Sequence, residues 1–245
     1  MSQLKIENLS IGYGEAKRLA EDINLSLQDG EFVGLLGQNG VGKSTFIRTI
    51  TGLHPRLSGG IFLGTENIDS LTSREISKKI SLVLTGKPET LTLSVIELIA
   101  LGRYPYSGWL GTLKPKDKAK IEEALTLMEI NYLTEKRLYE LSDGQLQKVM
   151  IARALAQDTD IIILDEPTSH LDLKNKIDVL HLLKKIATEG KTILISSHEV
   201  QLSAEVCDLF WCMDFGKPML TGKPTDLIES GELQEYLHVP QSVLK

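Results

Sequence analysis

The residues from Gly37 to Ser44 read G-Q-N-G-V-G-K-S and fit the pattern G-x-x-x-x-G-K-[ST]. Glycines at this spacing let the backbone curl so that its N–H groups point at phosphate oxygens. Lys43 can then reach the β- and γ-phosphates of a nucleotide, and Ser44 can offer its hydroxyl to Mg²⁺. The alternative is a glycine-rich turn that ends in Lys-Ser by chance. We expect a nucleoside triphosphate to be bound by Gly37, Gln38, Asn39, Gly40, Val41, Gly42, Lys43, Ser44 and Thr45.

Two neighbouring acids, Asp165 and Glu166, follow the apolar run 160–164. Ligands of parallel sheets bind at the carboxyl ends of the strands, where these carboxylates are expected to lie. Asp165 can hold Mg²⁺, directly or through water, and Glu166 can polarise the attacking water as a general base. An acid pair seen alone can simply cap a turn. Together with the phosphate-binding pattern, the pair favours hydrolysis.

These residues need strands and helices that bring them to one edge of a sheet. The apolar segment 31–36 predicts a strand that runs into the glycine-rich turn, and the residues from Lys43 to about Thr51 are typical of a helix. Further elements are expected as buried strands at 80–84, 160–164 and 192–196 and as a helix at about 174–188. Strands that alternate with helices indicate a parallel sheet with right-handed crossovers.

The remaining sequence predicts two additions to this α/β core. The first thirty residues alternate polar and apolar around a turn at Gly12-Tyr13-Gly14, which predicts short antiparallel strands. Between 87 and 157 no buried strand is expected, and segments such as 116–128 and 144–156 are typical of helices. We therefore expect one domain, 1–245, with an α/β core at 1–86 and 158–245, an N-terminal antiparallel β layer, and a helical subdomain at 87–157.

Composition narrows the class of protein. The 245 residues are 42% hydrophobic and 24% charged, which is ordinary for a folded globular chain. The formal net charge of −6 argues against a nucleic-acid partner. We expect neither a signal peptide at the N-terminus nor an apolar run of the ~20 residues that a membrane span needs. Cys207 and Cys212 lie among apolar residues at a spacing unlike that of a redox or zinc pair, so we expect buried thiols.

The segment from Leu141 to Gln145, followed by L-Q-K-V-M-I-A-R-A-L, resembles the signature sequence of the ABC ATPase family. Without that resemblance, Ser142 reads only as the N-cap of a helix. The family implies a P-loop NTPase (RecA-like) fold, ATP and Mg²⁺ as cofactors, and a head-to-tail dimer of two copies. In such a dimer Ser142, Gly144 and Gln145 contact the γ-phosphate of ATP bound to the other copy.

Other positions resemble the family in the order in which its motifs occur. Tyr13 resembles the aromatic residue that stacks on adenine, although it could also be a solvent-facing strand residue. The segment from Ser169 to Asp172 resembles the loop that links the two sites, and His198 resembles the switch histidine at the γ-phosphate. The pair His198-Glu199 is not a zinc-protease motif, because Leu202 stands where H-E-x-x-H requires histidine.

Two positions depart from the family pattern. After the strand at 80–84, where the family has a glutamine that contacts Mg²⁺ and the attacking water, this chain has Thr85. Because the threonine side chain is shorter, we expect Thr85 to contact the metal only through an intervening water. Asp143 replaces a glycine of the signature, and its charge is unfavourable near phosphate only if the side chain points inward.

Substrate and partners are expected from a weaker resemblance. The stretch from Gly102 to Gly111 contains Tyr104, Tyr106 and Trp109 in a chain that is only 5% aromatic, so it predicts either a protein interface or rings packed under the helices. Its G-R-Y-P string resembles ATPases of importers for iron-siderophore complexes, haem or cobalamin. That resemblance implies a transmembrane permease as partner, an extracytoplasmic substrate-binding protein, and a place at the cytoplasmic face of the inner membrane. An exporter ATPase is the first alternative, and a soluble ABC protein acting on ribosomes or DNA is the second.

Overall fold

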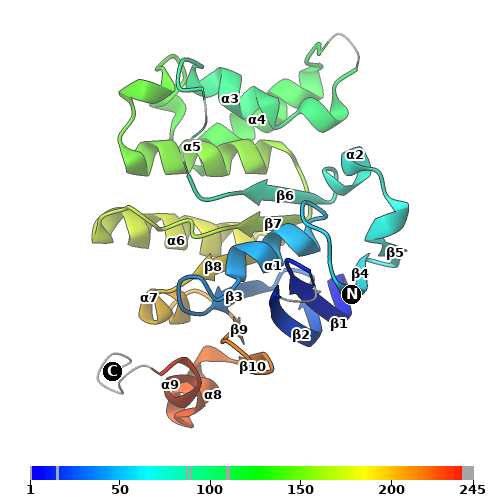
Figure 1. Cartoon of the computed structure of the whole chain (residues 1–245). Coiled ribbons are helices and arrows are strands. Elements are labelled where there is room, and N and C mark those ends of the chain that lie inside the picture. Colours follow the sequence, from blue (N-terminus) through cyan, green and yellow to red (C-terminus); the bar gives the residue numbers. More distant parts are fainter. Residues whose placement is uncertain (1, 15–16, 87, 89, 109–110, 239–245) are drawn as a thin grey trace.

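The structure is a computed structural model that describes residues 2–14, 17–86, 88, 90–108 and 111–238. A sheet of six strands runs through its middle in the order β10-β9-β3-β8-β7-β6, and all neighbours are parallel except the edge pair β9 and β10 (Figure 1). The strands are β3 (Phe32–Leu36), β6 (Ile80–Val83), β7 (Ile161–Leu164), β8 (Thr192–Ser197), β9 (Leu209–Cys212) and β10 (Leu220–Gly222). The four strands expected from the sequence all occur within one residue of their predicted limits, whereas β9 and β10 were not predicted.

A second sheet of four antiparallel strands forms the N-terminal layer, in the order β2-β1-β4-β5. Its members are β1 (Ser2–Gly12), β2 (Arg18–Gln28), β4 (Ser58–Leu63) and β5 (Glu66–Asn67). The prediction of short strands was wrong, since β1 and β2 have 11 residues each. Register shifts, which are typical of β-bulges, interrupt the β1–β2 pairing.

The strands of the central sheet bury both faces, and their alternate side chains enter two separate cores. On β7, Ile162 and Leu164 join a cluster with residues of α5 and α6, while Ile161 and Ile163 join a cluster with residues of α1 and β1. This period of two follows from the pleat of a strand. Continuous apolar runs such as I-I-I-L are therefore what a strand covered on both sides requires.

Helices pack on both faces of the central sheet. Their bounds are α1 (Lys43–Ile50), α2 (Ser73–Ile76), α3 (Val95–Leu101), α4 (Pro115–Leu127), α5 (Asp143–Ala156), α6 (Leu173–Thr188), α7 (Val200–Ala204), α8 (Pro224–Glu229) and α9 (Glu232–Leu237), with short 3₁₀ turns η2 (Ile68–Ser70), η3 (Tyr104–Tyr106), η4 (Asn131–Leu133) and η5 (Leu138–Glu140). Helices α3, α4 and α5 lie together at one end of the molecule, beyond β6 (Figure 1). Whether 87–157 behaves as a subdomain of its own stays a prediction.

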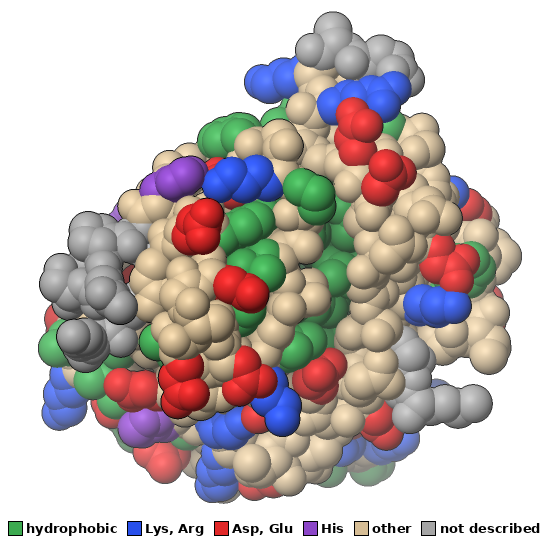
Figure 2. Space-filling view, turned by 90° about the horizontal axis from the view of Figure 1, so that it is seen from below, with side chains coloured by type: hydrophobic (Ala, Val, Ile, Leu, Met, Phe, Trp, Pro, Cys, Tyr) green, Lys and Arg blue, Asp and Glu red, His purple; other side chains and the backbone are tan. Residues whose placement is uncertain are grey.

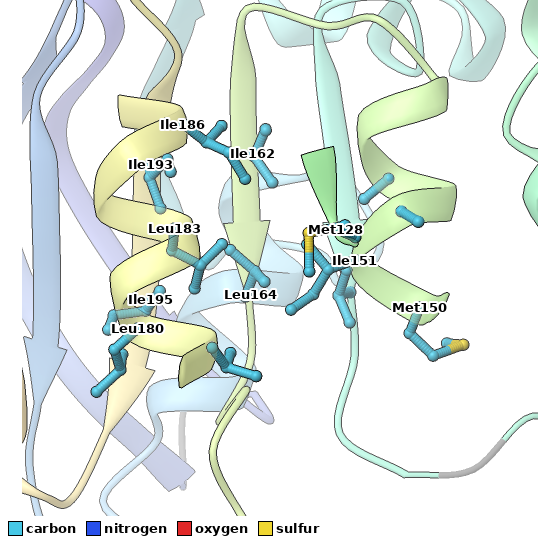
Figure 3. Close-up of a cluster of buried hydrophobic side chains, with 14 of the residues drawn as sticks. Met128, Met150, Ile151, Ile162, Leu164, Leu180, Leu183, Ile186, Ile193 and Ile195 are labelled. Atoms are coloured by element: carbon cyan, nitrogen blue, oxygen red, sulfur yellow. The ribbon is translucent and has the colours of Figure 1, made fainter. Parts of the chain in front are cut away.

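The helical end is joined to the central sheet by continuous apolar packing. Figure 3 shows Ile162 and Leu164 of β7 between Leu183 of α6 on one side and Met128 and Ile151 of the helical end on the other. Each such fully buried side chain stabilises the fold by about 2 kcal/mol relative to an exposed one. This packing joins β7, which ends at the two acids, to α5.

The aromatic stretch from 102 to 111 divides between core and surface. Arg103 is 2% exposed, donates to Oδ1 of Asp117 at 3.0 Å and to the carbonyl oxygen of Ala156 at 2.7 Å, and lies over the Tyr106 ring at 4.1 Å. Tyr104, by contrast, is 76% exposed. Packing among the helices, one of the two alternatives from the sequence, therefore applies to Tyr106. The interface alternative stays a prediction for the exposed Tyr104, and Trp109 lies outside the described residues.

The surface and the cysteines complete the description. Among the described residues, no helix is both long enough and apolar enough to cross a bilayer. On the face in Figure 2, basic side chains lie among acidic ones, with a band of apolar side chains near the centre. Cys207 and Cys212 are both buried and are free thiols, which confirms the expected core thiols. Burial raises the pKa of Cys212 to about 12, so its thiol stays protonated and unreactive.

Candidate nucleotide-binding and catalytic site

The glycine-rich loop leads from the carboxyl end of β3 into the first turn of α1, as the spacing predicts. A Cβ atom at Gly37 would lie 2.5 Å from the carbonyl oxygen of Met213, so the loop passes too close to its neighbour for any other residue. Gly42 precedes α1 with φ 117°, a conformation that favours glycine. The free N–H groups of the first turn of α1 therefore face the loop and form a site for an anion.

Lys43 is buried at the start of α1, with only 4% of its surface exposed. Its ammonium group donates to the carbonyl oxygens of Gly37 at 2.9 Å and Gln38 at 3.2 Å. Its Nζ also lies 3.4 Å from Oε1 of Glu166. A buried ammonium group requires such acceptors. Together they hold the Lys43 side chain against the loop that is expected to surround the phosphates.

Asp165 and Glu166 stand at the carboxyl end of β7, beside the end of β8. Ser196 of β8 donates its hydroxyl hydrogen to Oδ1 of Asp165 at 2.6 Å and accepts the backbone N–H of Glu166 at 2.8 Å. One hydroxyl thus fixes both acids. Sequence reasoning did not assign Ser196 to the site, because its bonds to the acids depend on β8 lying beside β7.

Glu166 is the point where three expected site residues meet. Its Oε1 lies 3.4 Å from Lys43 Nζ and 3.7 Å from Nδ1 of His198, which follows β8. Glu166 also has a positive φ of 49°, a conformation that costs a non-glycine residue about 1 kcal/mol. This backbone turn directs the chain away from the sheet while the carboxylate stays beside the lysine and the histidine.

A cavity of about 320 Å³ opens in front of the loop. Its walls are formed by Tyr13, Lys17, Leu19, Gly40, Gly42, Lys43, Ser44, Thr45 and Glu166. Tyr13 lies just beyond β1, is 56% exposed, and forms a 3.0 Å hydrogen bond between its hydroxyl and Oγ1 of Thr45. An exposed ring beside a phosphate loop can stack on a base. The cavity therefore combines an aromatic side chain with the lysine of the phosphate loop, as a nucleotide requires.

Thr85 lies close to the acids but is turned toward the backbone. Its hydroxyl donates to the carbonyl oxygen of Asp165 at 2.9 Å. Thr85 also lines a second, smaller cavity with Asp143, Glu166 and His170. The hydroxyl hydrogen is thus directed to the main chain, and only its oxygen lone pairs remain to interact with water or a metal ion.

The residues from Ser142 to Gln145 begin helix α5. The Ser142 hydroxyl accepts the N–H of Gln145, and the Gln145 side chain accepts the N–H of Ser142 at 3.1 Å, which forms a reciprocal capping box. Gly144 is packed so closely that a Cβ atom there would lie 2.8 Å from the Asn175 side chain. Asn175 in turn binds Asp172, the N-cap of α6, by two hydrogen bonds. These signature residues are absent from the walls of the phosphate-loop cavity.

Glu199 is a further residue that the sequence did not assign to the site. One of its carboxylate oxygens accepts the Thr168 hydroxyl at 2.9 Å, and the other accepts the ammonium group of Lys176 on α6. Glu199 therefore ties the turn that carries His198 to the segment after Glu166 and to α6. The acidic residue next to His198 was the available signal.

Comparison with known proteins agrees with this geometry. The family model described as ABC transporter matches residues 20–169. An uncharacterised ABC transporter ATP-binding protein of Methanocaldococcus jannaschii is 39% identical over 92% of this chain and 78% of its own length. The petrobactin import ATP-binding protein of Bacillus subtilis is 34% identical over 95% of this chain and 91% of its own length.

The fold agrees as well. A solved chain of a protein assigned to the metal-chelate type of ABC transporter, in an inward-facing conformation, has a TM-score of 0.85 and 27% identity over 98% of this chain and 90% of its own. The chain therefore belongs to the ABC transporter family, as its ATP-binding and ATP-hydrolysing subunit. Within that family it is similar to the ATPases that serve iron-chelate importers.

Proposed function

We propose that this chain hydrolyses ATP to drive the import of an iron chelate through a membrane permease. The observation that carries the hydrolytic part is the meeting of Lys43, Glu166 and His198 at one carboxylate oxygen. The similarity to a petrobactin import subunit supports the choice of an iron chelate over haem or cobalamin as cargo.

Each residue of the site has a distinct role in the proposed reaction. The loop amides and Lys43 balance the charge of the β- and γ-phosphates, and Tyr13 stacks on adenine. Glu166 accepts a proton from the water that attacks the γ-phosphate in line. His198 contacts the γ-phosphate from the side of β8. Because Glu166 lies 3.4 Å from Lys43, phosphates bound by the lysine would compete with this ion pair.

The donor set near the acids fits Mg²⁺. Ser44 and Asp165 supply a hydroxyl oxygen and carboxylate oxygens, which suit an ion that keeps water and phosphate oxygens in its shell. The ion would neutralise charge on the β- and γ-phosphates. Thr85 would take part through an intervening water, because its side chain is short, and its hydroxyl oxygen can accept a hydrogen bond from that water while donating to the carbonyl oxygen of Asp165.

Two copies are required to complete each ATP site. Ser142, Gly144 and Gln145 lie at the start of α5, where Ser142 is exposed and Gly144 is buried, and none of them lines the cavity that contains Lys43. A head-to-tail dimer would bring them to the γ-phosphate of ATP bound to the partner copy, with the N-terminus of α5 directed at its charge. Asp172 would lie in the loop that joins the two sites. ATP favours this closed dimer only through the contacts that it makes across the interface.

The permease is proposed to dock in the groove between α2 and the segment 104–108. Arg74 of α2 donates to the carbonyl oxygens of Pro105 at 2.9 Å and Ser107 at 2.8 Å, which joins α2 to this segment. The exposed Tyr104 forms part of its wall. An exposed aromatic side chain on a fixed backbone is suited to anchor a short helix of a partner protein. The chain would then lie at the cytoplasmic face of the inner membrane, held there by the permease.

Co-purification from gently solubilised membranes of the native host tests this assignment. Recovery of a multi-helix permease, followed by ATP-dependent uptake of a ferric siderophore into vesicles that contain the complex and an extracytoplasmic binding protein, supports it. Transport in the opposite direction would favour the exporter alternative. Recovery of ribosomes or of DNA-bound proteins instead would refute transport and leave only the ATPase.

A further inference from the structure

The Tyr13 side chain is held from several directions although it is largely exposed. Its hydroxyl is bound to Thr45 in the first turn of α1, and its ring packs against the imidazole of His54, with ring centroids 4.9 Å apart and planes inclined by 59°. Lys17 lies over the ring with its Nζ 5.4 Å from the centroid. A tyrosine on a bend outside a strand ordinarily samples several rotamers, so these contacts select one of them.

His54 itself is fixed by two hydrogen bonds at the end of α1. Its Nε2 lies 2.9 Å from the carbonyl oxygen of Gly12, the residue before Tyr13, and its backbone N–H donates to the carbonyl oxygen of Arg48 at 3.0 Å. A carbonyl oxygen can only accept, so Nε2 carries the hydrogen. The imidazole therefore holds both the backbone and the ring of the Tyr13 turn against the helix that begins with the phosphate-binding residues.

We propose that His54 is a positioning residue for the nucleobase, which acts by holding Tyr13 in the orientation that stacks on adenine. This inference rests on the proposed function, in which Tyr13 contacts the base and the α1 loop contacts the phosphates. The energetic reason is preorganisation. A ring that is already immobilised loses less conformational freedom when the base binds, so more of the stacking energy appears as affinity.

The link between His54 and the nucleotide is specific to the base end of the site. His54 contacts Tyr13 and Gly12, and it does not line the cavity in front of the phosphate loop. Its removal should therefore weaken the part of the affinity that comes from the base and leave the part that comes from the phosphates. A residue that merely supported the fold of the loop would change both.

The test is equilibrium binding to the full chain of MgATP and, as a probe without a base, of inorganic tripolyphosphate with Mg²⁺. We expect His54→Ala to raise the Kd for ATP about fivefold, a loss typical of one aromatic contact and one hydrogen bond, and to change the Kd for tripolyphosphate less than about twofold. His54→Phe keeps a ring and His54→Gln keeps a donor, so each should recover part of the loss. His181→Ala, at an exposed histidine of α6, is the matched control.

The double variant Tyr13→Ala with His54→Ala decides whether His54 acts through the tyrosine. If it does, the double variant binds ATP no more weakly than Tyr13→Ala alone. Additive losses, equal losses for ATP and tripolyphosphate, or an unchanged affinity in His54→Ala would each overturn the inference. Failure of the wild-type chain to bind or hydrolyse ATP would instead refute the proposed function, and this result does not depend on any His54 variant.

Discussion

The ammonium group of Lys43 and the carboxylate of Glu166 lie 3.4 Å apart, although they come from different strand ends on either side of β8. The lysine is almost fully buried, whereas the carboxylate is about one-fifth exposed. In the proposed reaction Lys43 contacts the γ-phosphate and Glu166 accepts a proton from the attacking water, so this contact would open when ATP binds. The charge of Glu166 therefore has two consequences in the proposed reaction, first as the partner of Lys43 and then as the base that accepts a proton from water.

Glu166→Gln should separate binding from turnover. The amide cannot accept a proton from water, so we expect the turnover number to fall at least about 100-fold, a loss typical of a missing general base. It also removes the competing charge beside Lys43, so ATP affinity should be kept or increased and the ATP-bound dimer should accumulate. Steady-state phosphate release and size-exclusion chromatography with MgATP measure the two effects. Glu189→Gln, at an exposed position after α6, is the control, and wild-type turnover in Glu166→Gln would exclude Glu166 as the base.

Ser196→Ala should raise the Mg²⁺ concentration that ATPase activity requires and should have a smaller effect on the stability of the fold. The variant removes the hydrogen bond that orients the Asp165 carboxylate and the one that fixes the Glu166 amide. Loss of such an outer contact typically weakens metal binding by about tenfold. The Mg²⁺ concentration for half-maximal ATPase activity measures it.

A serine on β6, two strands away from β8, offers a matched control. Ser81 of β6 is fully buried, and its hydroxyl has no hydrogen-bond partner in the part of the chain that the structure describes. Ser81→Ala should therefore leave the Mg²⁺ dependence unchanged. An equal shift in both variants would show that Ser196 acts only through packing.

Asp117→Asn should destabilise the chain at neutral pH. The carboxylate accepts hydrogen bonds from the backbone N–H of Lys114 at 2.9 Å and from the Nε–H of Arg103 at 3.0 Å. The side chains of Asp117 and Arg103 are almost fully buried. Removal of one partner leaves a buried guanidinium charge unpaired, which costs about 3 kcal/mol of unfolding free energy. Urea unfolding at pH 7 measures the loss. Glu123→Gln, in an exposed ion pair on the same helix, should change stability by less than about 1 kcal/mol.

The same variant should alter the dependence of stability on pH. The backbone hydrogen bond from Lys114 and, after it, Arg103 hold the pKa of Asp117 below its usual range. A carboxyl group with a lowered folded-state pKa stabilises the fold above its unfolded value, near pH 4, and this stabilisation is lost as the pH falls through the folded-state pKa. Between about pH 2 and pH 5 the free energy of unfolding should therefore depend less steeply on pH for Asp117→Asn than for the wild type. The same dependence on pH in both proteins would contradict the assignment.

Gly144→Ala should impair the signature helix through Asn175. The new methyl group would lie 2.8 Å from the Asn175 side chain, which cannot move freely because it is bound to Asp172. We expect a displaced helix start and a fall in ATPase turnover of about tenfold, since small misplacements near a reacting group are costly. Adding Asn175→Ala makes room and should restore part of the activity, with Asn175→Ala alone as the control. A double variant no better than Gly144→Ala would place the defect elsewhere.

Several features could be predicted from the sequence because their physical causes are local. The spacing of Gly37, Gly40, Gly42 and Lys43 defines a turn whose backbone can approach phosphate, whatever surrounds it. The apolar runs 160–164 and 192–196 are strands covered on both faces, and β7 and β8 confirm them. The cap at Ser142 was evident for the same reason, since a helix start is determined by its own next three residues.

Other features depend on which strands become neighbours, and only the tertiary structure decided them. The bond from Ser196 to Asp165 exists because β8 lies beside β7 in a particular register, and no spacing along the chain encodes that pairing. The contact of His54 with Tyr13 requires the end of α1 to meet the end of β1. Tyr104 and Tyr106 are only two residues apart, yet Tyr106 packs on the buried Arg103 and Tyr104 is exposed. Local chemistry thus determined which groups could bind ATP, and long-range packing determined what orients them.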